Sequence, residues 1–223
     1  EKRGSLCKKI GKDAYEILGI EDKHIAFSCS NAYYGNTTWK LNNIGTYQPA
    51  NAMLALEVMR ILFGDSGHPD VWREALSGVK WAGRMEEVLP DVFVDGAHNL
   101  SAVEAFAASV LPDVRGRVIL FSAVKDKDYE DMISCLCRNV QADFYVVTLI
   151  ADRRAAQAEE LGRLFERYTD KPVIVTENVK DALHYILAHR GERRVYCLGS
   201  LYLAGMIKEL TQEEYRCSTM RKN

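Results

Sequence analysis

The 223-residue chain has 48% hydrophobic residues and a formal net charge of −2, the composition of an ordinary globular protein. Its length is enough to bury one large core or two small ones, and its charge provides no basic field for nucleic acid. Apolar runs stay below the ~18 residues of a membrane span, and residues 1–12 lack the apolar stretch of a secretory signal. We therefore expect a cytoplasmic protein with neither membrane nor nucleic-acid partners.

The first 80 residues contain few predicted elements. Runs typical of β-strands occur at 13–18, 24–30 and 37–44, followed by helical patterns at 49–63 and 71–79. So few elements are expected to enclose too little area for a core of their own. Residues 1–80 are therefore predicted to be part of something larger.

A regular alternation of strands and helices follows. Apolar strands are expected at 92–95, 118–124, 143–150, 172–176 and 194–200, with helices at 99–110, 129–138, 155–168, 179–189 and 201–210. The segment MEEVL (85–89) can add an edge strand. Nearly continuous apolar strands, each followed by a helix, predict an α/β, Rossmann-like domain with a mostly parallel six-stranded sheet flanked by helices. We place this domain at residues 81–223.

The stretch FVDGAHN (93–99) ends an apolar strand with an acid, a glycine, a histidine and an asparagine. One interpretation is a strand-to-helix turn, in which Gly96 relaxes the backbone and Asn99 caps the helix. The other is a ligand site, because open α/β sheets bind ligands at the carboxyl ends of their strands.

Other polar residues are expected at the same edge of the sheet: Lys125, Asp126, Lys127, Asp128, Gly199 and Ser200, with Asp152 and Arg153 as solvated loop residues. The scattered cysteines form no C-x-x-C pair and have no zinc spacing, which predicts reduced thiols and no metal site. The chain also lacks a P-loop, a G-x-G-x-x-G turn and a G-x-S-x-G elbow. A triad of Ser200, His98 and Asp95 is disfavoured because two of its members share one turn.

Five segments, in order, resemble the folylpolyglutamate synthases and their dihydrofolate synthase relatives in the Mur ligase superfamily. They are YQPANAMLALEVMRIL (47–62), WAGRMEEV (81–88), FVDGAHN (93–99), SAVKDKD (122–128) and LGSLYLAGMI (198–207). In that family a C-terminal glutamate ligase domain follows an ATPase domain that carries the P-loop, the magnesium site and most of the folate pocket. The resemblance implies that residues 1–80 are the C-terminal remnant of such an ATPase domain and that residues 81–223 are the ligase domain.

The resemblance implies an ATP-dependent amide ligation, in which the γ-carboxylate of a folyl glutamate is phosphorylated and the amine of glutamate attacks the acyl phosphate. Folate, glutamate and ATP would be the small-molecule substrates, with Mg²⁺ held mainly outside this chain. The chain alone would be inactive, and the parent enzyme is expected to be monomeric. Polyglutamate synthesis, dihydrofolate synthesis or both activities remain open.

The resemblance also assigns roles to individual residues. Asn51, Arg84 and Asp95 would bind ATP at its adenine, phosphates and ribose, in that order. His98 and Ser200 would hold the incoming glutamate. Lys127, with His98, would act at the reacting carboxylate or phosphate.

Each residue also has a structural interpretation. Asn51, His98 and Ser200 occupy predicted helix starts, Asp95 can form a turn, and Arg84 and Lys127 can be solvated. Two positions depart from the family pattern: Tyr47 replaces a histidine and Ala82 a proline. A noncatalytic module that binds glutamate or a nucleotide is the alternative function, and an upstream P-loop in the same reading frame would decide between the two.

Overall fold

The computed structural model describes residues 7, 9–21, 23–31 and 33–220. The chain divides into two compact units, Glu1–Lys80 and Trp81–Asn223. Within the described ranges, no helix has both the length and the apolar character needed to cross a bilayer. The assignment of the first unit to an ATPase domain stays a prediction.

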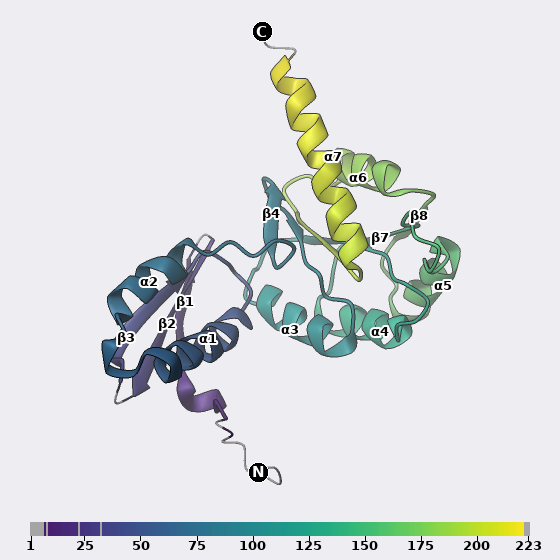
Figure 1. Cartoon of the computed structure of the whole chain (residues 1–223). Helices are drawn as coiled ribbons and strands as arrows, with labels where there is room; N and C mark the ends of the chain where they lie inside the picture. The colour runs from purple at the N-terminus through teal and green to yellow at the C-terminus, as the bar shows by residue number, and fades with distance from the viewer. Residues whose placement is uncertain (1–6, 8, 22, 32, 221–223) are drawn as a thin grey trace. The chain divides into compact units, whose positions relative to one another are not determined.

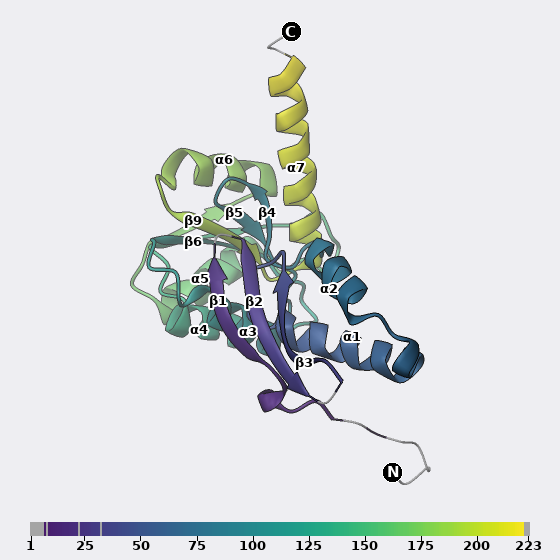
Figure 2. The same cartoon turned by 90° about the vertical axis from the view of Figure 1, so that its left-hand side faces the viewer.

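The first unit contains a three-stranded antiparallel sheet in the order β1-β2-β3 (Figure 2). Its strands are β1 (Glu16–Glu21), β2 (His24–Asn31) and β3 (Gly35–Leu41), and its helices are α1 (Gln48–Phe63) and α2 (Pro69–Gly78), with 3-10 turns η1 (Lys12–Ala14) and η2 (Gly64–Ser66). The first strand begins later than predicted because η1 takes up residues 12–14. The third begins and ends earlier than predicted, since it continues the antiparallel pairing from the Asn31–Gly35 pair to the Ile25–Leu41 pair.

This unit has a core of its own, so the expectation that it encloses too little area is wrong. Ile25, Phe27 and Cys29 alternate along β2 and are at most 1% exposed, the period-2 pattern of a strand with one buried face. Phe27 pairs with Trp39 across the sheet, and α1 adds buried apolar side chains to the same cluster.

Helix α1 is apolar on a second side that is not covered. Leu54, Val58, Ile61 and Leu62 are 59%, 48%, 59% and 70% exposed. They recur at the i, i+4, i+7 spacing that places side chains on one side of a helix. Helices that are apolar all round are usually buried, so this surface is unusual for a helix facing water.

The second unit is built on a six-stranded sheet in the order β4-β5-β9-β6-β7-β8. Figure 1 labels β4, β7 and β8 of this sheet, and Figure 2 labels β4, β5, β9 and β6. Its strands are β4 (Glu86–Leu89), β5 (Val92–Val94), β6 (Arg117–Phe121), β7 (Phe144–Thr148), β8 (Val173–Thr176) and β9 (Arg194–Leu198). Only the edge strand β4 is antiparallel to its neighbour. The predicted fold class is therefore confirmed, including the edge strand.

Helices cover both faces of this sheet. They are α3 (Leu100–Val110), α4 (Tyr129–Asn139), α5 (Ala158–Tyr168), α6 (Val179–His189) and α7 (Leu201–Met220). The chain moves in one direction from β5 through β6 and β7 to β8, and then returns to place β9 between β5 and β6. Right-handed crossovers in opposite directions lie on opposite faces, so α3, α4 and α5 cover one face while α6 covers the other, beside α7 (Figure 1).

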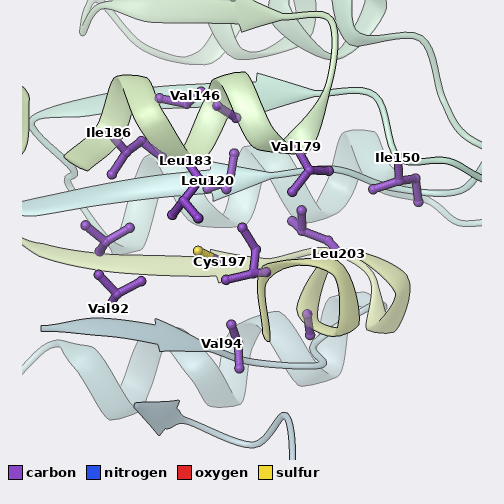
Figure 3. Close-up of a cluster of buried hydrophobic side chains, with 14 of the residues drawn as sticks. Val92, Val94, Leu120, Val146, Ile150, Val179, Leu183, Ile186, Cys197 and Leu203 are labelled. Atoms are coloured by element: carbon purple, nitrogen blue, oxygen red, sulfur yellow. The ribbon is translucent and has the colours of Figure 1, made fainter. Parts of the chain in front are cut away.

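A continuous apolar core fills the space between the sheet and the helices α6 and α7. Figure 3 shows Leu120, Val146 and Cys197 on the strands facing Leu183 and Leu203 on the two helices. Burial raises the pKa of the Cys197 thiol to about 12, which makes this thiol unreactive. The cysteines with described side chains are free thiols, as predicted: Cys7, Cys29, Cys135, Cys137 and Cys197.

The largest differences between predicted and observed helix bounds are in α5 and α7. Helix α5 begins at Ala158 and not at residue 155, because Ala155 forms a bridge with Val124 and the Ala156 N–H donates to Ala123 O at 2.9 Å. Helix α7 continues to Met220, beyond its predicted end at residue 210.

Candidate functional site

The candidate site lies where the direction of the sheet reverses. Strand β9 leads into α7 on one face, whereas its neighbours β5 and β6 lead into α3 and α4 on the other. The loops at these carboxyl ends therefore diverge, and a reversal point of this kind is the usual ligand position in open α/β sheets. Asp95, His98, Lys127 and Ser200 all lie on these three loops.

Asp95 organises the loop between β5 and α3. Its side chain is 3% exposed, and Oδ1 accepts the Ala97 N–H at 2.8 Å while Oδ2 accepts the Met85 N–H at 2.9 Å. The structural interpretation of Asp95 as a turn former is thus correct, and a ribose hydroxyl would have to use the remaining lone pairs of this buried carboxylate.

Arg84 lies beside the same loop. The Gly96 N–H donates to Gly83 O at 2.7 Å, and a Cβ built on Gly96 would be 3.2 Å from Nη1 of Arg84. Met85 has φ +46°, a left-handed conformation that is uncommon outside glycine, and Asp95 stabilises this turn through the Met85 N–H. The structure therefore brings Arg84 next to the loop that carries Asp95, and the assignment of both residues to ATP stays a prediction.

His98 has one ring nitrogen occupied and one available. Nδ1 lies 2.7 Å from Gly96 O, and because a carbonyl only accepts, Nδ1 carries the proton of the neutral ring. Nε2 of the half-buried ring is left for a ligand, as an acceptor when neutral and as a donor when the ring is cationic. Asn99 is the N-cap of α3, since its Oδ1 accepts the Ala102 N–H at 2.9 Å.

Ser200 lies next to the His98 loop. The Gly199 N–H donates to Ala97 O at 2.9 Å, which joins the two loops directly. Ser200 is 3% exposed, and its Oγ accepts the Tyr202 N–H at 3.1 Å, so it caps the start of α7. The hydroxyl proton remains able to donate to a carboxylate, and capping and binding are therefore compatible.

Lys127 stands on the third loop. Its N–H donates to Val124 O at 3.2 Å, and its side chain lines an open cavity of about 470 Å³ between α4 and α5. The charged side chains around this cavity are of both signs: Lys125, Lys127, Arg163 and Arg167 line it together with Asp128, Glu130 and Glu160.

Asn51 belongs to the first unit. It is exposed in the first turns of α1, and its Nδ2 donates to Gln48 Oε1 at 3.0 Å. The structure thus brings together Arg84, Asp95, His98 and Ser200, with Lys127 on the adjacent loop, and leaves Asn51 on a separate unit.

The charges at this edge of the sheet bear on the predicted nucleotide and metal sites. Arg84 and the start of α3 offer positive charge to phosphate groups. Nowhere in the described part of the chain do three or more His, Cys, Asp or Glu side chains form a group that could hold a metal.

Sequence reasoning missed Arg154. Its guanidinium donates to the Tyr202 hydroxyl at 2.7 Å, although the two residues are 48 positions apart. The Arg154 backbone N–H donates to Oδ1 of Asp152 and, with the guanidinium, lowers the pKa of that carboxyl. No motif marks this residue, because a charged pair in a loop usually faces solvent.

Comparisons with known proteins identify the relatives of the chain. Residues 83–201 match the family described as Mur ligase, glutamate ligase domain. The dihydrofolate synthase/folylpolyglutamate synthase of Mycobacterium tuberculosis is 32% identical over 148 residues, which are 62% of this chain and 30% of that protein. The protein of the same name from Bacillus subtilis is 29% identical over 174 residues, 74% of this chain and 39% of the relative.

A solved structure agrees with these matches. The folylpolyglutamate synthase of M. tuberculosis, complexed with ADP and AMPPCP, superposes with a TM-score of 0.79 and 25% identity. The match covers 90% of this chain and 48% of that one. This chain therefore spans less than half the length of the relatives that it matches.

Proposed function

This chain belongs to the Mur ligase superfamily, with the folylpolyglutamate and dihydrofolate synthases, and we propose that it forms the C-terminal part of an ATP-dependent ligase that adds glutamate to folyl (poly)glutamates. The convergence of three loops at the reversal point of the sheet carries this proposal. It brings a buried acid (Asp95), His98 and Ser200 to one edge, next to the turn that carries Arg84.

The reaction needs positive charge at the transferring phosphate and an oriented amine. Arg84 would stabilise negative charge on ATP, and Asp95 stabilises the turn that carries Arg84. His98 and Ser200 would orient the incoming glutamate, and Lys127 would neutralise charge on the reacting carboxylate or phosphate. Mg²⁺ would supply further positive charge against the phosphates, and the resemblance implies that it is held mainly by residues outside this chain.

The first unit is proposed to complete an ATPase domain. The exposed apolar side of α1 supports this, because a neighbouring part of such a domain would cover Leu54, Val58, Ile61 and Leu62. Asn51, near the start of the same helix, would then contact the adenine side of ATP. The cytoplasmic location and the monomeric state of the parent stay predictions.

The test compares this chain with the product of the reading frame extended upstream. Purified proteins would be assayed for ADP release that depends on both a folate and glutamate. We expect no turnover by residues 1–223 and turnover by the longer protein, whose added sequence should contain a P-loop. Activity with dihydropteroate as well as with folyl glutamates would indicate a bifunctional enzyme.

The same comparison tests the alternative of a noncatalytic binding module. An open reading frame that starts near Glu1 without an upstream P-loop would favour the module. Folate- and glutamate-dependent ADP release by the chain alone would contradict the proposed division of the active site.

A further inference from the structure

We propose that Arg154 is a positioning residue that fixes the loop of Lys127 relative to Ser200 and so shapes the glutamate site. This inference rests on the proposed function. It assigns a role to the loop between β7 and α5, from which the sequence predicted no site residue.

Backbone contacts join the Arg154 loop to the Lys127 loop. The Lys125 N–H donates to Arg154 O at 2.7 Å, and the Ala156 N–H donates to Ala123 O at 2.9 Å. Val124 and Ala155 form an antiparallel bridge between these two contacts. These three contacts hold the loop after β6 against the loop after β7.

The Arg154 side chain extends this connection to the third loop. Nη2 donates to the Tyr202 hydroxyl at 2.7 Å, and the guanidinium carbon lies 5.6 Å from the centre of the Tyr202 ring. Nε lies 3.3 Å from Oδ1 of Asp152, which keeps the guanidinium oriented. An arginine suits this position because its planar fork can bond an acid, a hydroxyl and a ring face at once.

Tyr202 completes the path to the site. Its N–H donates to Oγ of Ser200 at 3.1 Å, so the residue that receives the Arg154 hydrogen bond also orients the Ser200 hydroxyl. Arg154 therefore contacts the Lys127 loop directly and contacts Ser200 through one neighbour, Tyr202.

The contribution of Arg154 to folding should be small. The Arg154 side chain is 53% exposed, and ion pairs at such exposure stabilise folded proteins little. Loss of the contact is thus expected to alter binding of glutamate more than it alters the thermal midpoint.

The experiment titrates ¹⁵N-labelled chain with L-glutamate and follows amide signals by NMR. Arg154→Gln should weaken glutamate binding about fivefold or more, with a thermal midpoint within about 2 °C of the parent. Tyr202→Phe, which removes only the hydroxyl, should give a similar loss. The double variant should be little worse than either single variant, because both remove one contact. Arg154→Lys should recover part of the affinity.

Arg73→Gln is the matched control, because Arg73 is 49% exposed and pairs with Asp70 in the first unit. It should leave glutamate binding unchanged. In the longer protein, Arg154→Gln should raise the KM for glutamate and leave the KM for ATP unaltered, which a general structural defect would not do.

Unchanged affinity in both Arg154→Gln and Tyr202→Phe would overturn the role of Arg154 and leave the proposed ligase function intact. An equal loss in Arg73→Gln would also overturn it. Absence of glutamate binding by the unsubstituted chain would overturn the glutamate site itself, and with it this role.

Discussion

Asp95 has a structural role that any functional test must take into account. Two buried backbone N–H groups, those of Met85 and Ala97, depend on its carboxylate. Asp95→Ala leaves both donors unsatisfied, and each costs ~1–3 kcal/mol. We expect the free energy of unfolding of the chain to fall by about 2–4 kcal/mol in urea denaturation.

Asp126→Ala is the control for this measurement, because Asp126 is exposed on a neighbouring loop. Its effect should stay within about 0.5 kcal/mol. A loss below ~1 kcal/mol in Asp95→Ala would mean that the loop does not need the carboxylate. Kinetic comparison of Asp95 variants with ATP should therefore be made at a temperature at which they are folded.

His98 should affect glutamate more than ATP. Because Nδ1 is bonded to Gly96 O, Nε2 is the atom left for the substrate. His98→Ala in the longer protein should lower kcat/KM for glutamate about ten- to hundredfold, as expected for loss of a charge-assisted contact of ~1.5–3 kcal/mol. Saturation curves that vary glutamate and ATP in turn would measure the difference.

His189→Ala offers a matched control, since Nδ1 of His189 also lies 2.7 Å from a backbone carbonyl, that of Tyr185. It lies at the end of α6 and should leave both curves unchanged. A shift of the ATP curve alone in His98→Ala would assign His98 to the nucleotide.

Residue-level prediction worked where the signal was local. The capping by Asn99 follows from its place before a helix, and the turn at Asp95 follows from the strand that precedes it. The two hydrogen bonds of the Asp95 carboxylate and the Arg154–Tyr202 contact could not be predicted, because they depend on which loops the fold brings together.

At the scale of elements, the loop between β9 and α7 depends on a glycine. Gly199 has φ +104°, and a Cβ there would lie 2.3 Å from Ser122 O and 2.7 Å from the Phe121 ring. Gly199→Ala must therefore move the loop that carries Ser200. We expect a loss of more than ~1 kcal/mol of folding free energy, measured by urea unfolding.

Gly205→Ala is the control, and it should change the folding free energy in the opposite direction. Gly205 lies inside α7, and a Cβ there would meet nothing within 4 Å. Alanine is the better helix former, so this variant should gain about 0.5–1 kcal/mol. If both substitutions changed the folding free energy similarly, the loop would tolerate a Cβ at position 199 close to Ser122 O and the Phe121 ring.

The elements of the second unit were predictable because buried parallel strands are continuous apolar runs. The strand VILFSAV illustrates this, since residues 118–121 are fully buried. Strand order was not predictable from these runs, because nothing in the sequence of β9 specifies insertion between β5 and β6. In the first unit, antiparallel partners set the ends of β1 and β3, and a single-strand pattern carries no information on the partner.

At the scale of the whole molecule, the exposed apolar side of α1 affects how the chain associates with other surfaces. The second unit buries apolar side chains on helices at both faces of its sheet, such as Phe165 on α5 and Leu183 on α6, whereas α1 of the first unit has a buried side and an exposed apolar side. Large apolar side chains such as Leu54 and Leu62 each gain ~1.5–3 kcal/mol on burial, so water is an unfavourable environment for this surface. The isolated chain should therefore self-associate as its concentration rises.

Leu54→Lys with Leu62→Lys should abolish this association and leave the thermal midpoint of the chain nearly unchanged, because both side chains are more than half exposed. Sedimentation velocity across a concentration series measures the effect. Val114→Lys is the control, since Val114 is 98% exposed in the second unit and lies outside α1. It should leave the association intact.

In the longer protein the two lysines should instead lower the thermal midpoint, because they would be buried against the completed domain. A chain that stays monomeric at all concentrations, or a longer protein unaffected by the lysines, would show that nothing covers this side of α1.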